Sequence, residues 1–127
     1  MAELADAYAY SSRAEEAVEL LKQAMRLNPH YPDFYLWYLA DAFYALRRYD
    51  EAVQALERMH NPSAGQRLLA ASCAQMGNQH RAAEHAAEVL RLQPDFSISR
   101  WAQKQPEKDS AELQHLIEGL RKAGLPE

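Results

Sequence analysis

The stretch DFYLWYLADAFYALRRYDEAVQALERMHNP, residues 33–62, decides the fold, because it holds two helical patterns separated by a short polar break. Apolar residues recur at helical spacing on both sides of the break RRYD, residues 47–50. A break this short joins two antiparallel helices. Pro62 then ends the second helix, because proline lacks a backbone donor and its ring clashes with the preceding turn. The stretch therefore predicts a helix–turn–helix unit.

Two further segments share this pattern of helix, polar break, helix and closing proline. The three segments are residues 1–29, with the break SSR at 11–13, residues 30–62, and residues 63–94, with the break GNQ at 77–79. The closing prolines at 29, 62 and 94 are 33 and 32 residues apart. A constant period of this length indicates stacked repeats of one two-helix unit.

Small residues at matching places explain how such units would pack. Alanines recur midway along each first helix and near the start of each second helix: Ala5, Ala40 and Ala70, then Ala17, Ala52 and Ala82. A methyl side chain lets two helix axes approach closely. One hairpin cannot bury its own apolar face, but three stacked hairpins can. We therefore predict an all-α fold of three antiparallel helix pairs, stacked as a short right-handed α-solenoid.

The tail, residues 95–127, departs from the repeat and predicts a short linker helix and a C-terminal capping helix. The linker helix should begin near Ser97, and the last helix should cover residues 110–123. The apolar stripe of the last helix consists of Leu113, Leu116, Ile117 and Leu120. This stripe caps the array if it docks, and it is a dimerisation surface if it does not. Trp101, beside Arg100 and Lys104, either forms a contact patch or covers the third repeat.

Composition excludes several classes of protein. The net charge of −4 over 127 residues lacks the basic character of a nucleic-acid binder. No apolar run reaches the roughly 18 residues that a membrane helix needs. The acidic N-terminus MAELADAYAY does not resemble a secretory signal. With a single cysteine, Cys73, the chain has no internal disulfide. We expect a cytoplasmic protein without a cofactor, a nucleic-acid partner or a membrane partner.

The three segments resemble the tetratricopeptide repeat family over residues 1–94. The second segment carries the family pattern of a small residue, an aromatic, a turn and an alanine most fully, as Ala40, Phe43, Tyr49 and Ala52. The first and third segments depart from it in part. A turn glycine is present only at Gly77, and Cys73 occupies a place where an aromatic is usual.

A second resemblance covers nearly the whole chain. The strings HYPDFYLWYLADAFYALRRYDEA, PDFSISR and LRKAGLPE are similar to the C-terminal repeat region of some bacterial class III adenylate/guanylate cyclases. The resemblance implies a regulatory or scaffolding part of a larger bacterial signalling protein. It transfers no catalytic residue, because no part of the chain fits a cyclase core.

The repeat family implies that a partner binds in a concave groove lined by the first helix of each pair. Carried onto this sequence, the groove residues are Asp6, Tyr10, Phe34, Trp37, Asp41, Tyr44, Arg67 and Gln75. Trp37, Asp41 and Tyr44 share one helix face and would provide an aromatic anchor beside a carboxylate. The carboxylate clamp of chaperone-binding members is absent, so Asp6 and Asp41 favour a ligand of basic character.

Two function classes remain open after this reading. The first is a non-catalytic module that binds a protein, a peptide or a neighbouring domain of the parent protein. The second is a structural or oligomerisation domain without a peptide groove, in which the chain associates with itself. The aromatic residues of the groove would then pack against neighbouring repeats and bind nothing.

Other reactive residues point to structure rather than chemistry. His80 and Glu84 have the i, i+4 spacing of metal ligands, but His85 faces another direction, so a solvated helix face is the preferred interpretation. Cys73 lies in an apolar stripe, which indicates a buried structural thiol. No nucleophile–base pattern or phosphate loop is present, so we expect neither an enzyme nor a metal site.

Overall fold

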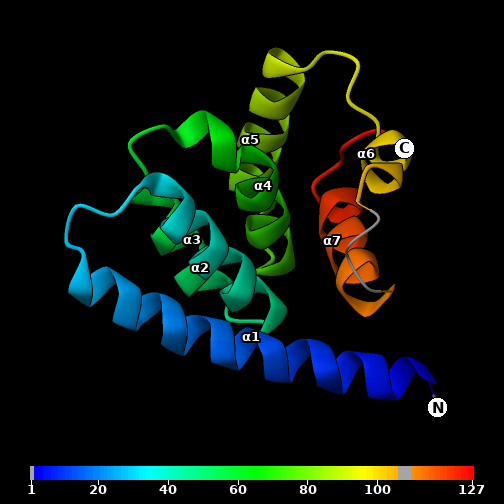
Figure 1. Ribbon diagram of the computed structural model, residues 1–127. Coiled ribbons are helices and arrows are strands. Elements are labelled where there is room, and N and C mark those ends of the chain that lie inside the picture. The colour runs from blue at the N-terminus through cyan, green and yellow to red at the C-terminus, as the bar shows by residue number, and fades with distance from the viewer. Residues whose placement is uncertain (1, 106–109) are drawn as a thin grey trace.

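The computed structural model describes residues 2–105 and 110–127, and it describes only the backbone of residues 2–11, 62 and 110. All regular structure in these ranges is helical, which confirms the all-α fold class (Figure 1). The elements are α1 (Ala2–Leu27), α2 (Asp33–Ala45), α3 (Tyr49–Glu57), the 3₁₀-helix η1 (Pro62–Gly65), α4 (Gln66–Gln75), α5 (Gln79–Leu92), α6 (Ile98–Gln103) and α7 (Ser110–Lys122).

The first segment differs from the prediction, because the break expected at residues 11–13 does not occur. Helix α1 runs without interruption over 26 residues and lies along one edge of the molecule (Figure 1). Serine lowers helix propensity only slightly compared with glycine or proline, and neither of those residues occurs between Ala2 and Leu27. The surrounding alanine, leucine and glutamate residues therefore carry the helix through Ser11 and Ser12.

The second and third segments form the predicted helix pairs, α2 with α3 and α4 with α5. Their turns have the same geometry, because Arg47 and Gly77 both adopt a left-handed conformation, with φ of 61° and 83°. In each turn the next residue donates its N–H to the carbonyl five residues earlier, at 2.9 Å. This is the hydrogen bond of a Schellman helix end. Arginine therefore occupies a position that favours glycine.

Four of the six repeated alanines lie in the core, whereas Ala17 is half-buried and the side chain of Ala5 lies outside the described part of the structure. Ala40, Ala52, Ala70 and Ala82 are all completely buried. Larger side chains, such as the fully buried Leu56, fill the space between the helix pairs. The close approach that a methyl group permits thus positions the helices in both pairs.

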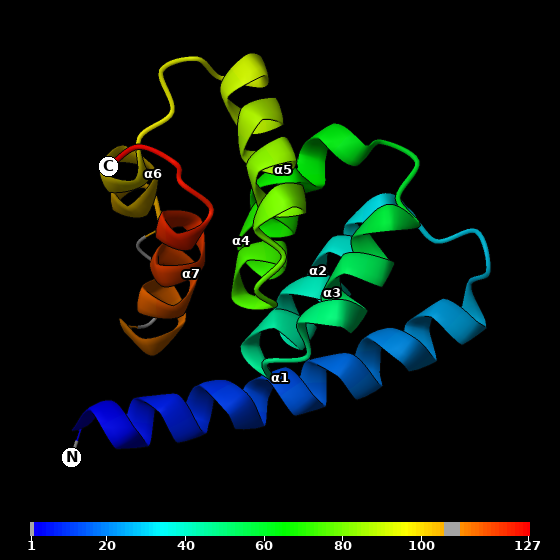
Figure 2. The same ribbon diagram turned by 180° about the vertical axis from the view of Figure 1, so that it is seen from behind.

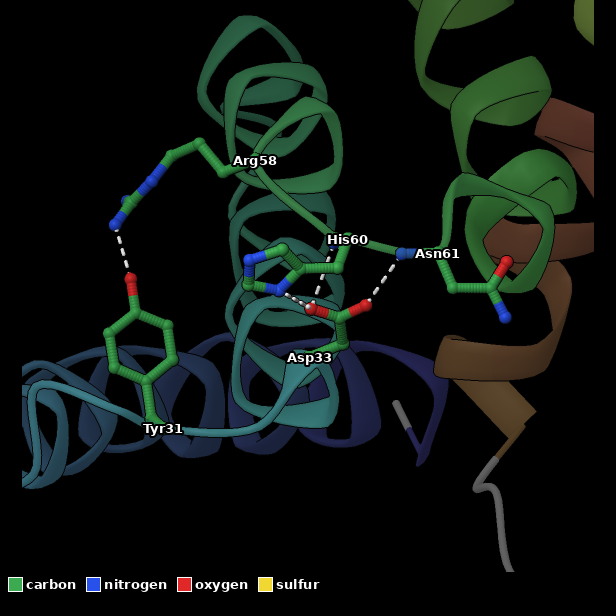
Figure 3. Close-up of polar contacts among 5 residues, drawn as sticks. All are labelled: Tyr31, Asp33, Arg58, His60 and Asn61. Atoms are coloured by element: carbon green, nitrogen blue, oxygen red, sulfur yellow. Dashed lines mark hydrogen bonds and ion pairs between the residues drawn. The ribbon is translucent and has the colours of Figure 1, made fainter.

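An ionic contact ties the two ends of the second helix pair together (Figure 3). Asp33, in the first turn of α2, accepts hydrogen bonds from the N–H groups of His60 and Asn61 at 2.9 and 2.8 Å. These hydrogen bonds hold the pKa of the Asp33 carboxyl below its usual value, since they favour its charged form. Beside it, Arg58 donates to the hydroxyl of Tyr31. The loop after α3 is therefore fixed to the start of α2.

The tail forms the two predicted helices, and Ser97 caps α6 by accepting a hydrogen bond from the N–H of Arg100. Gly124 ends α7 in a left-handed conformation. The chain end then returns to α6, where the Ile98 N–H donates to the Pro126 carbonyl at 2.8 Å (Figure 2). Helix α7 packs mainly against α4 and also contacts α1 and α6, so the predicted intramolecular cap is confirmed. The division of the chain at residues 29, 62 and 94 stays a prediction.

Candidate functional site

Helix α7 lies on the side of the helix pairs formed by their first helices, α2 and α4 (Figure 1). Its stripe of Leu116, Ile117 and Leu120 is buried there. Gly119 permits the close approach, because a Cβ atom at this position would lie 2.3 Å from the Tyr44 hydroxyl and 2.8 Å from the Cβ of Ala71. The concave face is thus partly filled by the chain's own last helix.

A buried polar cluster holds α7 in this place. The Tyr44 hydroxyl donates to the main-chain carbonyl of His115 at 2.6 Å, and the two rings lie 4.3 Å apart between centroids. A second hydrogen bond joins the Tyr49 hydroxyl to Nε2 of His115 at 2.8 Å. Gln75 donates to the Tyr44 hydroxyl at 3.3 Å and accepts from Lys122 at 2.9 Å. Side chains from α2, α3, α4 and α7 therefore meet at one point.

Burial changes the acid–base behaviour of this cluster. It lowers the pKa of His115 to about 4, and the nearby positive charge of Arg47 acts in the same direction. Burial also raises the pKa values of Tyr44 and Tyr49, because a phenolate would lose its hydration. At neutral pH the imidazole and both phenols are uncharged. The hydrogen bonds that join Tyr44 and Tyr49 to His115 are therefore between uncharged groups, and the Lys122 ammonium adds a charged donor at Gln75.

The predicted groove residues fall into three groups. Tyr44 is completely buried and Gln75 is half-buried beneath α7, so neither is open to a partner while α7 is docked. Trp37 and Asp41 are half-buried, and Phe34 and Arg67 are exposed. The side chains of the remaining two predicted residues, Asp6 and Tyr10, lie outside the described part of the structure.

The open part of the concave face is a cavity of about 110 Å³ between α2, α4, α6 and α7. Trp37, Asp41 and Arg67 enter it from one side, and Trp101 and Gln105 enter from the other. Leu116 and Leu120 of α7 form part of its wall. Trp37, Asp41 and Arg67, which the sequence placed in the groove, are thus brought together, whereas Tyr44 is not part of this opening.

A second hollow of about 260 Å³ continues from the first past Arg67 and Trp101. Arg100 and Lys104 of α6 line it, so three cations face this end and Asp95 is the one acidic residue among the lining groups. Arg100 is engaged with Asp95, since its guanidinium donates to the Asp95 carbonyl at 2.9 Å. Within the described ranges neither the guanidinium of Arg67 nor the ammonium of Lys104 has a hydrogen bond or an ion pair. Although the Arg67 side chain is exposed, the protein atoms packed around it lower the pKa of its guanidinium by partial desolvation.

Sequence reasoning missed the contribution of the tail to this site. Trp101, Arg100 and Lys104 were identified as a possible patch, but not as the wall opposite Trp37. Gln105, Leu116 and Leu120 were not identified as lining residues at all. The amphipathic stripe of the last helix indicates that it docks, but no spacing in the sequence indicates which face receives it.

The other reactive side chains show ordinary structural contacts. Cys73 is buried, and burial raises the pKa of its thiol. His80 pairs with Glu84 at 2.7 Å on an exposed helix face, while His85 bonds to Gln66. Among the residues that the structure describes, no group of three metal-ligating side chains lies close enough to hold an ion.

Comparison with known families agrees with the α2–α3 pair and the helices on either side of it. The tetratricopeptide repeat family matches residues 8–76, which is more than half of the chain. The chain belongs to the tetratricopeptide repeat family. No curated protein and no solved structure matches it. Tetratricopeptide repeats generally mediate contacts between proteins. Nowhere in the described ranges is a helix both long enough and apolar enough to cross a membrane.

Proposed function

We propose that this chain is a non-catalytic protein-binding module that grips a peptide segment in the opening between Trp37 and Trp101. The observation that carries the proposal is the meeting of two tryptophans and an unpaired arginine in one cavity. Tryptophan and arginine are the residues that most often dominate the free energy of protein interfaces. Together they can anchor a segment that inserts one apolar side chain.

The chemistry of the partner follows from the charges along the opening. Arg67, Arg100 and Lys104 line its outer end, against the single carboxylate of Asp95. The Arg67 side chain is exposed and has no ion-pair partner among the described residues, so a carboxylate of a partner can form a charge-assisted hydrogen bond with its guanidinium. We therefore expect a peptide that carries an apolar side chain for the tryptophans and an acidic group for this end. This differs from the basic ligand that Asp6 and Asp41 alone suggested.

We further propose that the module regulates or scaffolds a larger bacterial signalling protein in the cytoplasm. This regulatory role is supported by the similarity of three sequence strings to the repeat region of some bacterial cyclases. That similarity transfers no catalytic residue to this chain. The partner segment would then belong to another protein or to a neighbouring domain.

The test uses the fact that both tryptophans of the chain lie in the opening, so their fluorescence reports on it directly. A library of random linear peptides is selected on the wild-type chain, and the enriched peptides are titrated by tryptophan fluorescence and by calorimetry. Trp37→Ala should weaken binding by about tenfold or more, the loss expected for an anchor residue. Arg67→Gln should weaken binding and reduce its dependence on salt.

The matched control is Tyr38→Ala, which removes an exposed aromatic one residue away that does not line this opening. Its affinity should equal that of the wild type. A selection that enriches no peptide, or peptides that bind Trp37→Ala as tightly as the wild type, would contradict the proposed function.

A further inference from the structure

A larger apolar hollow, of about 530 Å³, lies between α1 and α2. Leu20 and Leu21 line it from α1, and Tyr35 and Tyr38 line it from α2. Three charged residues stand among these apolar ones: Arg13 of α1, Asp41 of α2 and Glu112 of α7. Leu20 is 65% exposed and Tyr38 is 53% exposed. Large apolar side chains gathered in a groove usually mark a surface that another chain covers. We call this hollow the α1/α2 groove.

An internal repeat in the sequence indicates that α1 lacks a neighbouring helix in this groove. Residues 4–21 align with residues 39–56 without a gap, beginning LADAY and LADAF. In this alignment Leu20 matches Ala55 and Leu21 matches Leu56, which are 3% and 0% exposed. Ala55 and Leu56 belong to α3, which packs against its antiparallel partner α2. The second half of α1 therefore lacks the antiparallel helix that its counterpart has.

The exposure of Tyr38, on the α2 side of the groove, also indicates that a helix is missing there. The left-handed residues Arg47 and Gly77 show that α2 and α4 are related by an offset of 30 residues. Tyr38 then corresponds to Leu68, which is 4% exposed, whereas Tyr38 is 53% exposed. Leu68 has both α2 and α7 beside it, since it lines the opening together with Trp37 and Leu116. The α1/α2 groove is thus the place that the first helix of a first pair would fill.

The sequence that fits this place is residues 2–11, but in the structure they cannot reach it. They continue α1 in a straight line beyond the groove (Figures 1 and 2). At a rise of 1.5 Å per residue they extend roughly 15 Å past the groove. Folding back would require a turn at Ser12, the residue that matches the left-handed Arg47. For a residue other than glycine that conformation costs about 1–2 kcal/mol.

We propose that residues 2–11 of a second copy of this chain fill the α1/α2 groove, so that two chains exchange their N-terminal helical segments. Two straight α1 helices lying antiparallel around a two-fold axis place each segment against the other chain's second half. This is the orientation that α2 has toward α3. Short hinges that resist folding favour such exchange. In the sequence alignment Leu4, Ala5 and Tyr8 match Leu39, Ala40 and Phe43 of α2.

Light scattering on the full chain after size-exclusion chromatography, over a concentration series, tests the exchange. The wild-type mass should rise from 14.5 kDa toward twice that value. Leu20→Glu should keep the mass at that of one chain, because the carboxylate lies in the groove. The matched control, Leu27→Glu, changes an 87% exposed leucine of the same helix that does not line the groove, and it should dimerise like the wild type.

Variants at Ser12, where α1 would have to turn back, distinguish the exchange of N-terminal segments from a simple contact between the grooves of two chains. Ser12→Gly permits the left-handed turn, so it should shift the chains toward the monomer, whereas Ser12→Ala should keep the dimer. Tyr38→Glu, on the opposite wall, should repeat the effect of Leu20→Glu. A wild-type mass that stays at one chain, a dimer that survives both glutamate variants, or a dimer that Ser12→Gly leaves unchanged would overturn the proposal. Asp41 lines both this groove and the peptide opening, whereas Trp37 and Arg67 line only the opening and Leu20 lines only the groove, so the variants at these three residues test the two proposals separately.

Discussion

Replacing Gly119 by alanine should loosen the docking of α7 on the concave face. The added methyl carbon would lie 2.3 Å from the Tyr44 hydroxyl, 2.8 Å from the Cβ of Ala71 and 3.2 Å from the Cα of Ala71. Non-bonded carbon contacts are normally about 3.5–4.0 Å long. Neither neighbour can yield easily, because Tyr44 is completely buried and hydrogen-bonded and the Cα of Ala71 is main chain. Helix α7 must therefore move outward by roughly 1 Å.

Two opposing energies set the size of the effect. Overpacking of this kind costs about 1–3 kcal/mol, and loss of the hydrogen bond from Tyr44 to His115 adds about 1 kcal/mol. Alanine stabilises a helix by about 1 kcal/mol relative to glycine. The free energy of unfolding should fall by about 1–3 kcal/mol in total. The helical content of α7 should not fall, since alanine favours the helix even when it is undocked.

Urea unfolding followed by circular dichroism measures the stability, and hydrogen exchange of the α7 amides measures the docking. Gln114→Ala, on the exposed face of the same helix, is the control and should change the free energy of unfolding by less than about 0.5 kcal/mol. If Gly119→Ala leaves both stability and α7 exchange at wild-type values, then α7 does not lie against Tyr44 and Ala71 in solution.

Three further predictions concern single residues. Arg47→Gly should raise the free energy of unfolding by about 0.5–1 kcal/mol in urea denaturation, because glycine adopts the left-handed turn without strain; a loss of stability would contradict this. His115 has a lower pKa folded than unfolded, so the unfolded chain binds more protons and stability should fall by about 2 kcal/mol between pH 7 and pH 5. His115→Phe should flatten that part of the profile, and an unchanged slope would refute the assignment. Asp33→Asn should lower the melting temperature at neutral pH, and the difference from wild type should vanish in acid below the lowered pKa of Asp33, where the wild-type carboxyl is also protonated; a difference that persists there would point to another cause.

The local parts of the fold follow from the sequence. The α2–α3 and α4–α5 pairs, their turns and their buried alanines depend on helical spacing and on residues close together in the chain. The same reasoning failed at Ser11 and Ser12, because it treated a weak helix former as a break. The similarity of residues 4–21 to residues 39–56 favours a turn there, while helix propensity favours continuation. A pattern alone does not decide between two such local preferences.

Only the local part of the candidate site follows from the sequence. Trp37 and Asp41 share one face of α2, so their common direction follows from an i, i+4 spacing. The contact between Tyr44 and His115 joins residues 71 positions apart, and no local pattern encodes it. The need for glycine at position 119 is evident only from the structure, in which Ala71 lies beside it. The position of α7, and with it the burial of Tyr44 and the second wall at Trp101, required the three-dimensional structure.

In the described part of the chain, α7 docks on the concave face and leaves the opening between Trp37 and Trp101 for a partner. The most direct test is a pH titration of the assigned His115 ring signals by nuclear magnetic resonance on the intact chain. The account predicts a midpoint at about 4, together with magnetisation transfer to the ring of Tyr44, whose centroid lies 4.3 Å away. A midpoint near the ordinary value of about 6.5 without that transfer would place His115 in solvent and contradict the account.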